Sequence, residues 1–120
     1  MRGAQKTNHK RGAYLLPNIS VNGREILLDE DGFVLDPEQW DEDVAVFCAP
    51  DEWVNELTED HWKVIRYLRD YYTMFQLAPM VRRLCRETGN SLKNIYELFP
   101  TGPSKGACKL AGLPKPPGCV

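Results

Sequence analysis

The strongest pattern in the chain is helical and lies in the segment LTEDHWKVIRYLRDYYTMFQLAP, residues 57–79. Thr58 can cap the start of a helix, and the two acids that follow it suit the positive end of the helix dipole. Apolar residues then recur at the three- and four-residue spacing of one helix face: Trp62, Ile65, Leu68, Tyr72 and Phe75. We expect this segment to form a central core helix against which the rest of the chain packs.

Shorter helices are expected on both sides of it. Asp36 is predicted to cap a helix that carries Trp40, Val44 and Phe47 on one face, and a second short helix begins near Pro50 and carries Trp53, Val54 and Leu57. Towards the C-terminus, glycine and proline stop signals and a serine cap predict three more helices, over residues 79–89, 91–100 and 103–111.

The N-terminal part of the chain predicts a hairpin. Asn22 and Gly23 lie between two short apolar runs, and both tolerate the positive φ of a type I′ turn. Residues 1–17 show no sustained period, so we interpret them as an N-terminal arm or extension. The expected fold is α+β and mainly α: an N-terminal β-hairpin on a small orthogonal helical bundle over residues 18–112, followed by a mobile C-terminal arm over residues 113–120.

Length and charge narrow the class of protein. A chain of 120 residues with 42% hydrophobic side chains can bury one modest core. It shows no apolar run of about 18 residues and no secretory signal, so we expect a cytoplasmic protein whose resting cysteines are reduced. Residues 25–60 hold fourteen acids and no Lys or Arg, whereas residues 63–120 hold ten basic residues and three acids. The basic part is either solvated helix surface or a face that steers the protein to a partner.

The C-terminal sequence GACKLAGLPKPPGCV contains Cys108 and Cys119, separated by ten residues. This spacing matches neither the short spacings of zinc sites nor a C-x-x-C redox motif. Three prolines stiffen the segment, and we expect hinges at the glycines, which are Gly106, Gly112 and Gly118. We hypothesise that Cys119 is the nucleophilic thiol and that Cys108 recaptures it, with thiolates stabilised by Lys105, Lys109 and Lys115. Inert thiols or a structural disulfide are the alternatives.

Other candidate sites are weaker. Cys48 and Cys85 lie on apolar helix faces and are expected to be inert, and His61 and His9 have no ligand-spaced partners for a metal site. Residues 79–99 have the outline of a helix-turn-helix, but the second helix offers few groups for reading DNA, so we do not favour DNA binding. We favour a basic docking face for a protein partner.

Four stretches carry a resemblance to a known family: LDEDGF at residues 28–33, TEDHWKVIRYLRDYY at 58–72, APMVRRL at 78–84 and LFPTGPSKGACKLAGLPKPPGCV at 98–120. The chain is similar to the DsrC/TusE family of sulfur-carrier proteins, whose members have a β-hairpin on a helical bundle and a mobile C-terminal arm. The chain has Cys108 in addition to the penultimate cysteine, Cys119, and this resembles the DsrC branch more than the TusE branch.

The resemblance implies a function. Cys119 would enter the alpha/beta subunits of a dissimilatory sulfite reductase, and sulfur would then be held as a trisulfide between Cys119 and Cys108 until a membrane-bound Dsr electron-transfer complex reduces it. The alternative is a TusE-like persulfide relay for tRNA thiolation, and sulfurtransferase donors would be further partners. Siroheme and iron–sulfur clusters would belong to the partner, so the chain has no cofactor of its own and is not expected to reduce sulfite alone. The predicted docking residues are Arg82, Arg83, Lys105, Lys109 and Lys115.

Overall fold

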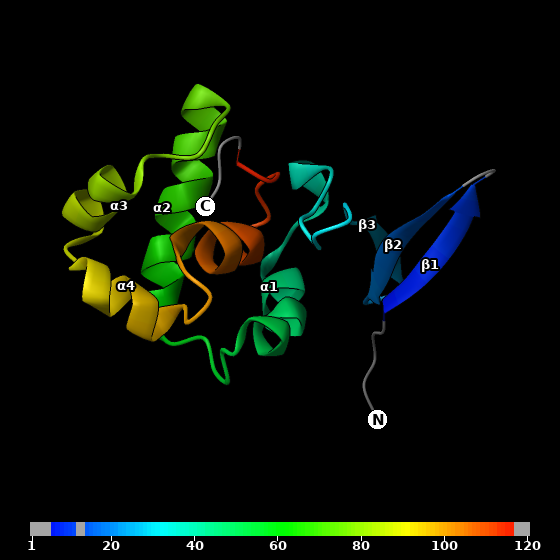
Figure 1. Ribbon diagram of the computed structural model, residues 1–120, viewed down its shortest axis with the longest axis horizontal. Helices are drawn as coiled ribbons and strands as arrows, with labels where there is room; N and C mark the ends of the chain where they lie inside the picture. Colours follow the sequence, from blue (N-terminus) through cyan, green and yellow to red (C-terminus); the bar gives the residue numbers. More distant parts are fainter. Residues whose placement is uncertain (1–5, 12–13, 117–120) are drawn as a thin grey trace.

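The computed structural model describes residues 6–11 and 14–116. It has a helical body from which a narrow antiparallel sheet projects at one end (Figure 1). The strands are β1 (Lys6–Arg11), β2 (Tyr14–Val21) and β3 (Arg24–Leu27). The helical elements are η1 (Pro37–Gln39), α1 (Glu42–Cys48), η2 (Ala49–Glu52), α2 (Glu59–Phe75), α3 (Val81–Thr88), α4 (Leu92–Leu98) and η3 (Pro103–Cys108). The predicted α+β, mainly helical fold is confirmed.

The predicted hairpin is the β2–β3 pair. Asn22 and Gly23 have φ values of 53° and 80° at its turn, as the type I′ prediction requires. Its apolar residues face the body, and Ile19 pairs with Ile26 in the register. A further strand, β1, pairs with β2 inside the segment that we interpreted as an arm. Its polar sequence has no apolar alternation, so it gives no periodic signal of a strand.

The central helix α2 begins where predicted. The backbone N–H of Thr58 donates to His61 Nδ1 at 3.0 Å, so the other ring nitrogen, Nε2, carries the proton and donates to the carbonyl of Leu98 at 2.8 Å. His61 therefore caps α2 and joins its start to the end of α4. Ile65 and Leu68 are buried as expected, but Phe75 is 47% exposed because the last turn of α2 extends beyond the helices that cover it (Figure 1).

The region before α2 differs from the prediction of one helix from Asp36. Asp36 does cap η1, but the chain becomes extended at Trp40 and Asp41 caps a separate helix, α1, by accepting from Val44 N at 3.1 Å. The predicted second helix is only the short turn η2, which ends at Trp53 in a left-handed conformation. Asp36 and Asp41 each begin a separate helical element, so the expected single helix is interrupted between them. The interruption lets the Trp40 side chain turn towards the C-terminal segment.

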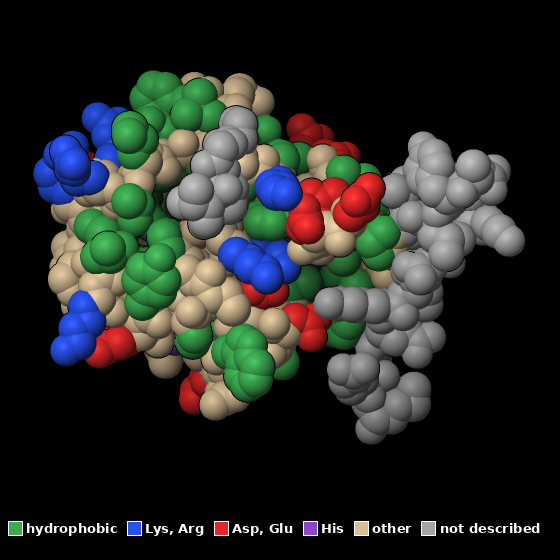
Figure 2. All heavy atoms as spheres, viewed as in Figure 1, with side chains coloured by type: hydrophobic (Ala, Val, Ile, Leu, Met, Phe, Trp, Pro, Cys, Tyr) green, Lys and Arg blue, Asp and Glu red, His purple; other side chains and the backbone are tan. Residues whose placement is uncertain are grey.

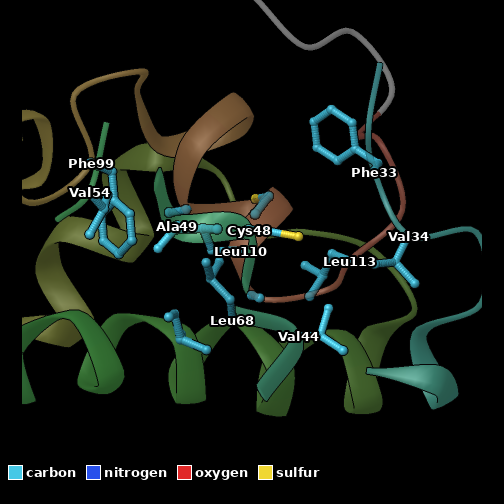
Figure 3. Close-up of a cluster of buried hydrophobic side chains, with 14 of the residues drawn as sticks. Phe33, Val34, Val44, Cys48, Ala49, Val54, Leu68, Phe99, Leu110 and Leu113 are labelled. Atoms are coloured by element: carbon cyan, nitrogen blue, oxygen red, sulfur yellow. The ribbon is translucent and has the colours of Figure 1, made fainter. Parts of the chain in front are cut away.

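The later helices are confirmed. Gly89 ends α3 with a φ of 75°, and Ser91 caps α4 by accepting from Asn94 N at 3.1 Å. The last helix runs through η3 to a turn at Gly112. Side chains from α1, α2 and the C-terminal segment meet in one core (Figure 3). Leu113, which we placed at the start of the arm, is 1% exposed and belongs to this core. Among the described helices none is long and apolar enough to cross a membrane.

Candidate functional site

Cys108 lies at the end of η3 and is 5% exposed. It lines a groove of about 520 Å³. One side of the groove is η3, and the other is formed by the segment before α3 together with α3 and α4. The rim of the groove is apolar and open to solvent, with side chains that are 40–80% exposed: Leu77, Met80, Val81, Leu92 and Tyr96. The predicted resolving cysteine therefore lies beneath a wide apolar opening rather than on a bare surface.

The chain after Cys108 turns back towards the same groove. Gly112 has a φ of 75°, and the next amide, Leu113 N, donates to the Cys108 carbonyl at 3.1 Å. Pro116 then lines the groove together with Cys108. Cys119, the predicted nucleophile, lies outside the described residues. Three chain steps separate it from Pro116, and such a stretch spans at most about 11 Å.

Two side chains from distant elements hold the chain just after Cys108. Trp40 Nε1 donates to the Leu110 carbonyl at 2.8 Å, and one guanidinium nitrogen of Arg69 donates to the Ala111 carbonyl at 2.8 Å. The Arg69 guanidinium also lies 4.1 Å from the centre of the Trp40 ring. Burial lowers the pKa of Arg69 because its charged form loses hydration. Both residues bind the backbone from which the arm leaves.

The glycines near Cys108 are packing positions. A Cβ on Gly112 would lie 2.3 Å from the Trp40 ring, and one on Gly106 would lie 2.7 Å from Thr101 Oγ1. These contacts leave no room for a side chain at either position. Hinge motion at Gly106 and Gly112 stays a prediction, and Gly118 lies outside the described residues.

Lys109 is not on the surface, contrary to the docking role that we predicted for it. Its ammonium donates to Glu52 Oε2 at 2.8 Å, and the exposed fractions of the Lys109 and Glu52 side chains are 10% and 4%. Thr101 donates to the other Glu52 oxygen at 2.7 Å. The charge of Lys109 is thus neutralised inside the protein, where it joins the turn after Cys108 to η2.

Lys115 ties the arm to the turn after β3. Its ammonium lies 2.6 Å from Asp31 Oδ2, and both side chains are half exposed. This hydrogen bond, with smaller contributions from the charges of Lys109 and Lys105, lowers the pKa of Asp31 below its usual value. Figure 2 shows basic and acidic side chains in contact near the centre of this face. Lys109 and Lys115 thus both have acidic partners, and stabilisation of thiolates by Lys105, Lys109 and Lys115 stays a prediction.

Arg82 and Arg83 are exposed on α3, next to Val81 of the groove rim. The Arg83 guanidinium lies 5.7 Å from the centre of the Tyr71 ring, and no described acidic side chain forms an ion pair with either arginine. Docking through Arg82, Arg83 and the exposed Lys105 stays a prediction. The helix pair α3–α4 exists as expected, and a DNA-binding role for it is equally untested.

Sequence reasoning missed three residues of this region. Glu52 gave no signal, because nothing in its neighbours marks an acid that turns inward. Trp40 was expected only as a core residue. Arg69 had a signal: it lies four positions after Ile65 and three before Tyr72, on the apolar stripe of α2. A charged residue at such a position must find partners when the stripe is covered.

Comparisons with known proteins agree with the earlier resemblance. Residues 20–120 match the family model described as "DsrC like protein". The chain is 46% identical over 105 residues to the dissimilatory-type sulfite reductase subunit gamma of Nitratidesulfovibrio vulgaris, covering 88% of this chain and 100% of that protein. It is 42% identical over 110 residues to the sulfurtransferase TusE of Escherichia coli, covering 85% of this chain and 99% of that protein.

Solved structures show the same fold. A crystal structure of dissimilatory sulfite reductase I contains a chain that is 47% identical, with a TM-score of 0.82, covering 86% of this chain and 99% of that chain. The crystal structure of the oxidized gamma subunit of the Archaeoglobus fulgidus enzyme is 51% identical, with a TM-score of 0.77, covering 87% of this chain and 100% of that chain. The match spans nearly the full length of each relative.

Proposed function

This chain belongs to the DsrC-like family, and from that premise we propose that it is a sulfur carrier that serves dissimilatory sulfite reductase as a co-substrate. One relative is named as the gamma subunit of that enzyme, and another is a chain in a crystal structure of the enzyme, so the alpha and beta subunits are the proposed partners. The observation that supports carriage most directly is the shared groove: Cys108 lines it, and so does Pro116 of the returning arm.

The proposed cycle uses Cys119 to collect sulfur and Cys108 to secure it. Two-electron reduction of sulfite inside the reductase would bring its sulfur to the +2 level, and Cys119 would bind it as Cys119–S–S–OH with loss of one water. The arm would then return to the groove, where the Cys108 thiol would displace the second oxygen as water and close the trisulfide, with one added sulfur and the loss of both thiol hydrogens. A membrane-bound Dsr electron-transfer complex would supply the electrons that release sulfide and restore both thiols. Siroheme and iron–sulfur chemistry would be the partner's.

The geometry suits a carrier because Cys108 is both shielded and reachable. A cysteine that is 5% exposed at the floor of an apolar groove is shielded from bulky thiols. An arm of the same chain reaches it without a bimolecular encounter, which favours the intramolecular bond. We propose that this carriage takes place in the cytoplasm, where reduced thiols are the resting state.

A second candidate is a persulfide relay of the TusE type, which the 42% identity to a sulfurtransferase TusE favours. In such a relay Cys119 alone would accept and pass on sulfur from a sulfurtransferase donor, and Cys108 would be dispensable. The two candidates therefore differ in whether the second cysteine takes part.

Mass spectrometry after turnover with sulfite and the dissimilatory reductase tests the proposal. Carriage by both cysteines predicts a gain of about 30 Da over the dithiol protein, from one sulfur added and two hydrogens lost. Cys108→Ala should lose that species and Cys119→Ala should carry no sulfur. A wild-type protein without any adduct would refute co-substrate carriage. An adduct that is the same in Cys108→Ala would refute the two-cysteine cycle and favour the relay.

A further inference from the structure

The segment from which the arm leaves, residues 110–113, is called the arm root here. A helix end normally leaves its last carbonyls without helical partners. Here four consecutive carbonyls are bonded: those of Cys108 and Lys109 accept from Leu113 N and Gly112 N, at 3.1 and 3.0 Å. The next two, Leu110 and Ala111, accept from the side chains of Trp40 and Arg69, both at 2.8 Å. All four backbone carbonyls from Cys108 to Ala111 therefore accept a hydrogen bond.

The two side-chain donors hold each other as well. The Arg69 guanidinium stacks 4.1 Å from the centre of the Trp40 ring, and its other terminal nitrogen donates to the Pro37 carbonyl at 3.1 Å. Gly112 packs so tightly on Trp40 that a Cβ there would overlap the ring. Because Arg69 belongs to α2, the longest helix, the arm root is tied to the most regular part of the body.

From this arrangement we propose that Trp40 and Arg69 are positioning residues that fix the pivot of the arm at Leu113. Six chain steps lie between Leu113 and Cys119, so the swinging segment reaches at most about 22 Å. A fixed pivot limits the volume that Cys119 can explore, and this would raise its effective concentration at Cys108. The proposal rests on the proposed function, in which Cys119 returns to Cys108 after collecting sulfur.

The effective concentration can be measured in full-length protein without the reductase. The protein is equilibrated with reduced and oxidised glutathione. Formation of the Cys108–Cys119 disulfide removes two electrons and two protons from the thiols and converts one oxidised glutathione into two reduced molecules. After acid quenching and alkylation, trypsin cleaves after Lys105 and Lys109. Only the disulfide then holds the fragments GACK and LAGLPKPPGCV together, and their linked mass reports the closed form.

Trp40→Phe keeps an aromatic ring but removes the donor to Leu110, and Arg69→Lys keeps the charge but cannot bond Ala111 and Pro37 while stacking on Trp40. A frayed root gains conformational freedom that ring closure must remove, so each variant should lower the effective concentration about three- to tenfold. Ile26→Val in β3 is the control: it weakens the core away from the root and should leave the value unchanged. Hydrogen exchange at the Gly112 and Leu113 amides should accelerate more than exchange at other amides in the two root variants. In the control, the root amides should not accelerate relative to the others.

An effective concentration within about twofold of wild type in both root variants would overturn the proposal, because the contacts would then be structural only. So would a wild-type protein that forms no such disulfide, or root amides that exchange no faster in the variants. These outcomes are independent of sulfite turnover. If the root variants behave as expected while turnover leaves no sulfur on the protein, the pivot stands and the proposed carriage falls.

Discussion

The ammonium of Lys109 lies 2.8 Å from the carboxylate of Glu52, inside the protein and one residue after Cys108. A surface lysine would take part in docking, whereas this one joins the C-terminal turn to η2. Thr101 completes the cluster by donating to Glu52 at 2.7 Å. The pair thus anchors the backbone that presents Cys108 on the groove floor.

Removing one partner of the Lys109–Glu52 pair should lower the free energy of unfolding strongly, and removing both charges should lower it much less. Lys109→Met leaves a buried carboxylate without its partner and should lower the free energy of unfolding by about 3 to 5 kcal/mol. Combining it with Glu52→Gln removes the stranded charge while Thr101 can still donate to the amide oxygen, and should recover most of that loss. Urea denaturation of the three proteins measures both values. Equal instability of the single and double variants would contradict the role of the charge pair.

Two glycines with the same backbone conformation should respond differently to alanine. Gly89 and Gly112 both have a φ of 75°, but only at Gly112 would a Cβ meet neighbouring atoms, at 2.3 Å from Trp40. Gly89→Ala should cost about 1 to 2 kcal/mol for the left-handed conformation alone. Gly112→Ala should cost clearly more, because the Trp40 ring must also move. Thermal or urea unfolding checks the order, and a Gly112→Ala protein as stable as Gly89→Ala would show that Trp40 does not hold the turn.

The tie between the arm and the turn after β3 should be visible in the titration of Asp31. The Lys115 ammonium holds the pKa of Asp31 below its usual value, so the pair stabilises the folded state above that usual value, and this contribution is lost as the pH falls through the lowered pKa. NMR titration of the Asp31 carboxyl should show the lowered value in wild type and a higher one in Lys115→Gln. An unchanged titration in that variant would mean that the ion pair does not form in solution.

The exposed arginines of α3 should steer the protein to its partner. Reversing both charges in Arg82→Glu/Arg83→Glu should slow association with the sulfite reductase about tenfold at low salt, and the difference should fade as salt screens the charges. The control is Lys63→Glu/Arg66→Glu, which changes the net charge equally on the exposed face of α2. Stopped-flow or surface-plasmon measurements give the rates. Equal slowing in both double variants would point to net charge rather than to a docking face on α3.

Local interactions were predictable from the sequence. The start of α2 at Thr58, the turn at Asn22 and Gly23, and the end of α3 at Gly89 each depend on residues a few positions apart. The sequence also singled out Cys108, Cys119 and the proline-rich segment between them as a candidate site, and the roles of the two cysteines stay predictions. It could not reveal β1, whose polar residues have no periodic pattern.

The tertiary structure decided which side chains surround Cys108. Lys109 reads as a surface lysine until Glu52, fifty-seven positions away, is placed beside it. Trp40 and Arg69 meet the arm root across seventy and forty-two positions, so no local pattern could assign them that task. By itself, the sequence determined that Cys108 and Cys119 flank a segment with three prolines. Whether that arm pivots freely or from a fixed point depends on buried hydrogen bonds and close packing between distant segments, which only the folded chain brings together.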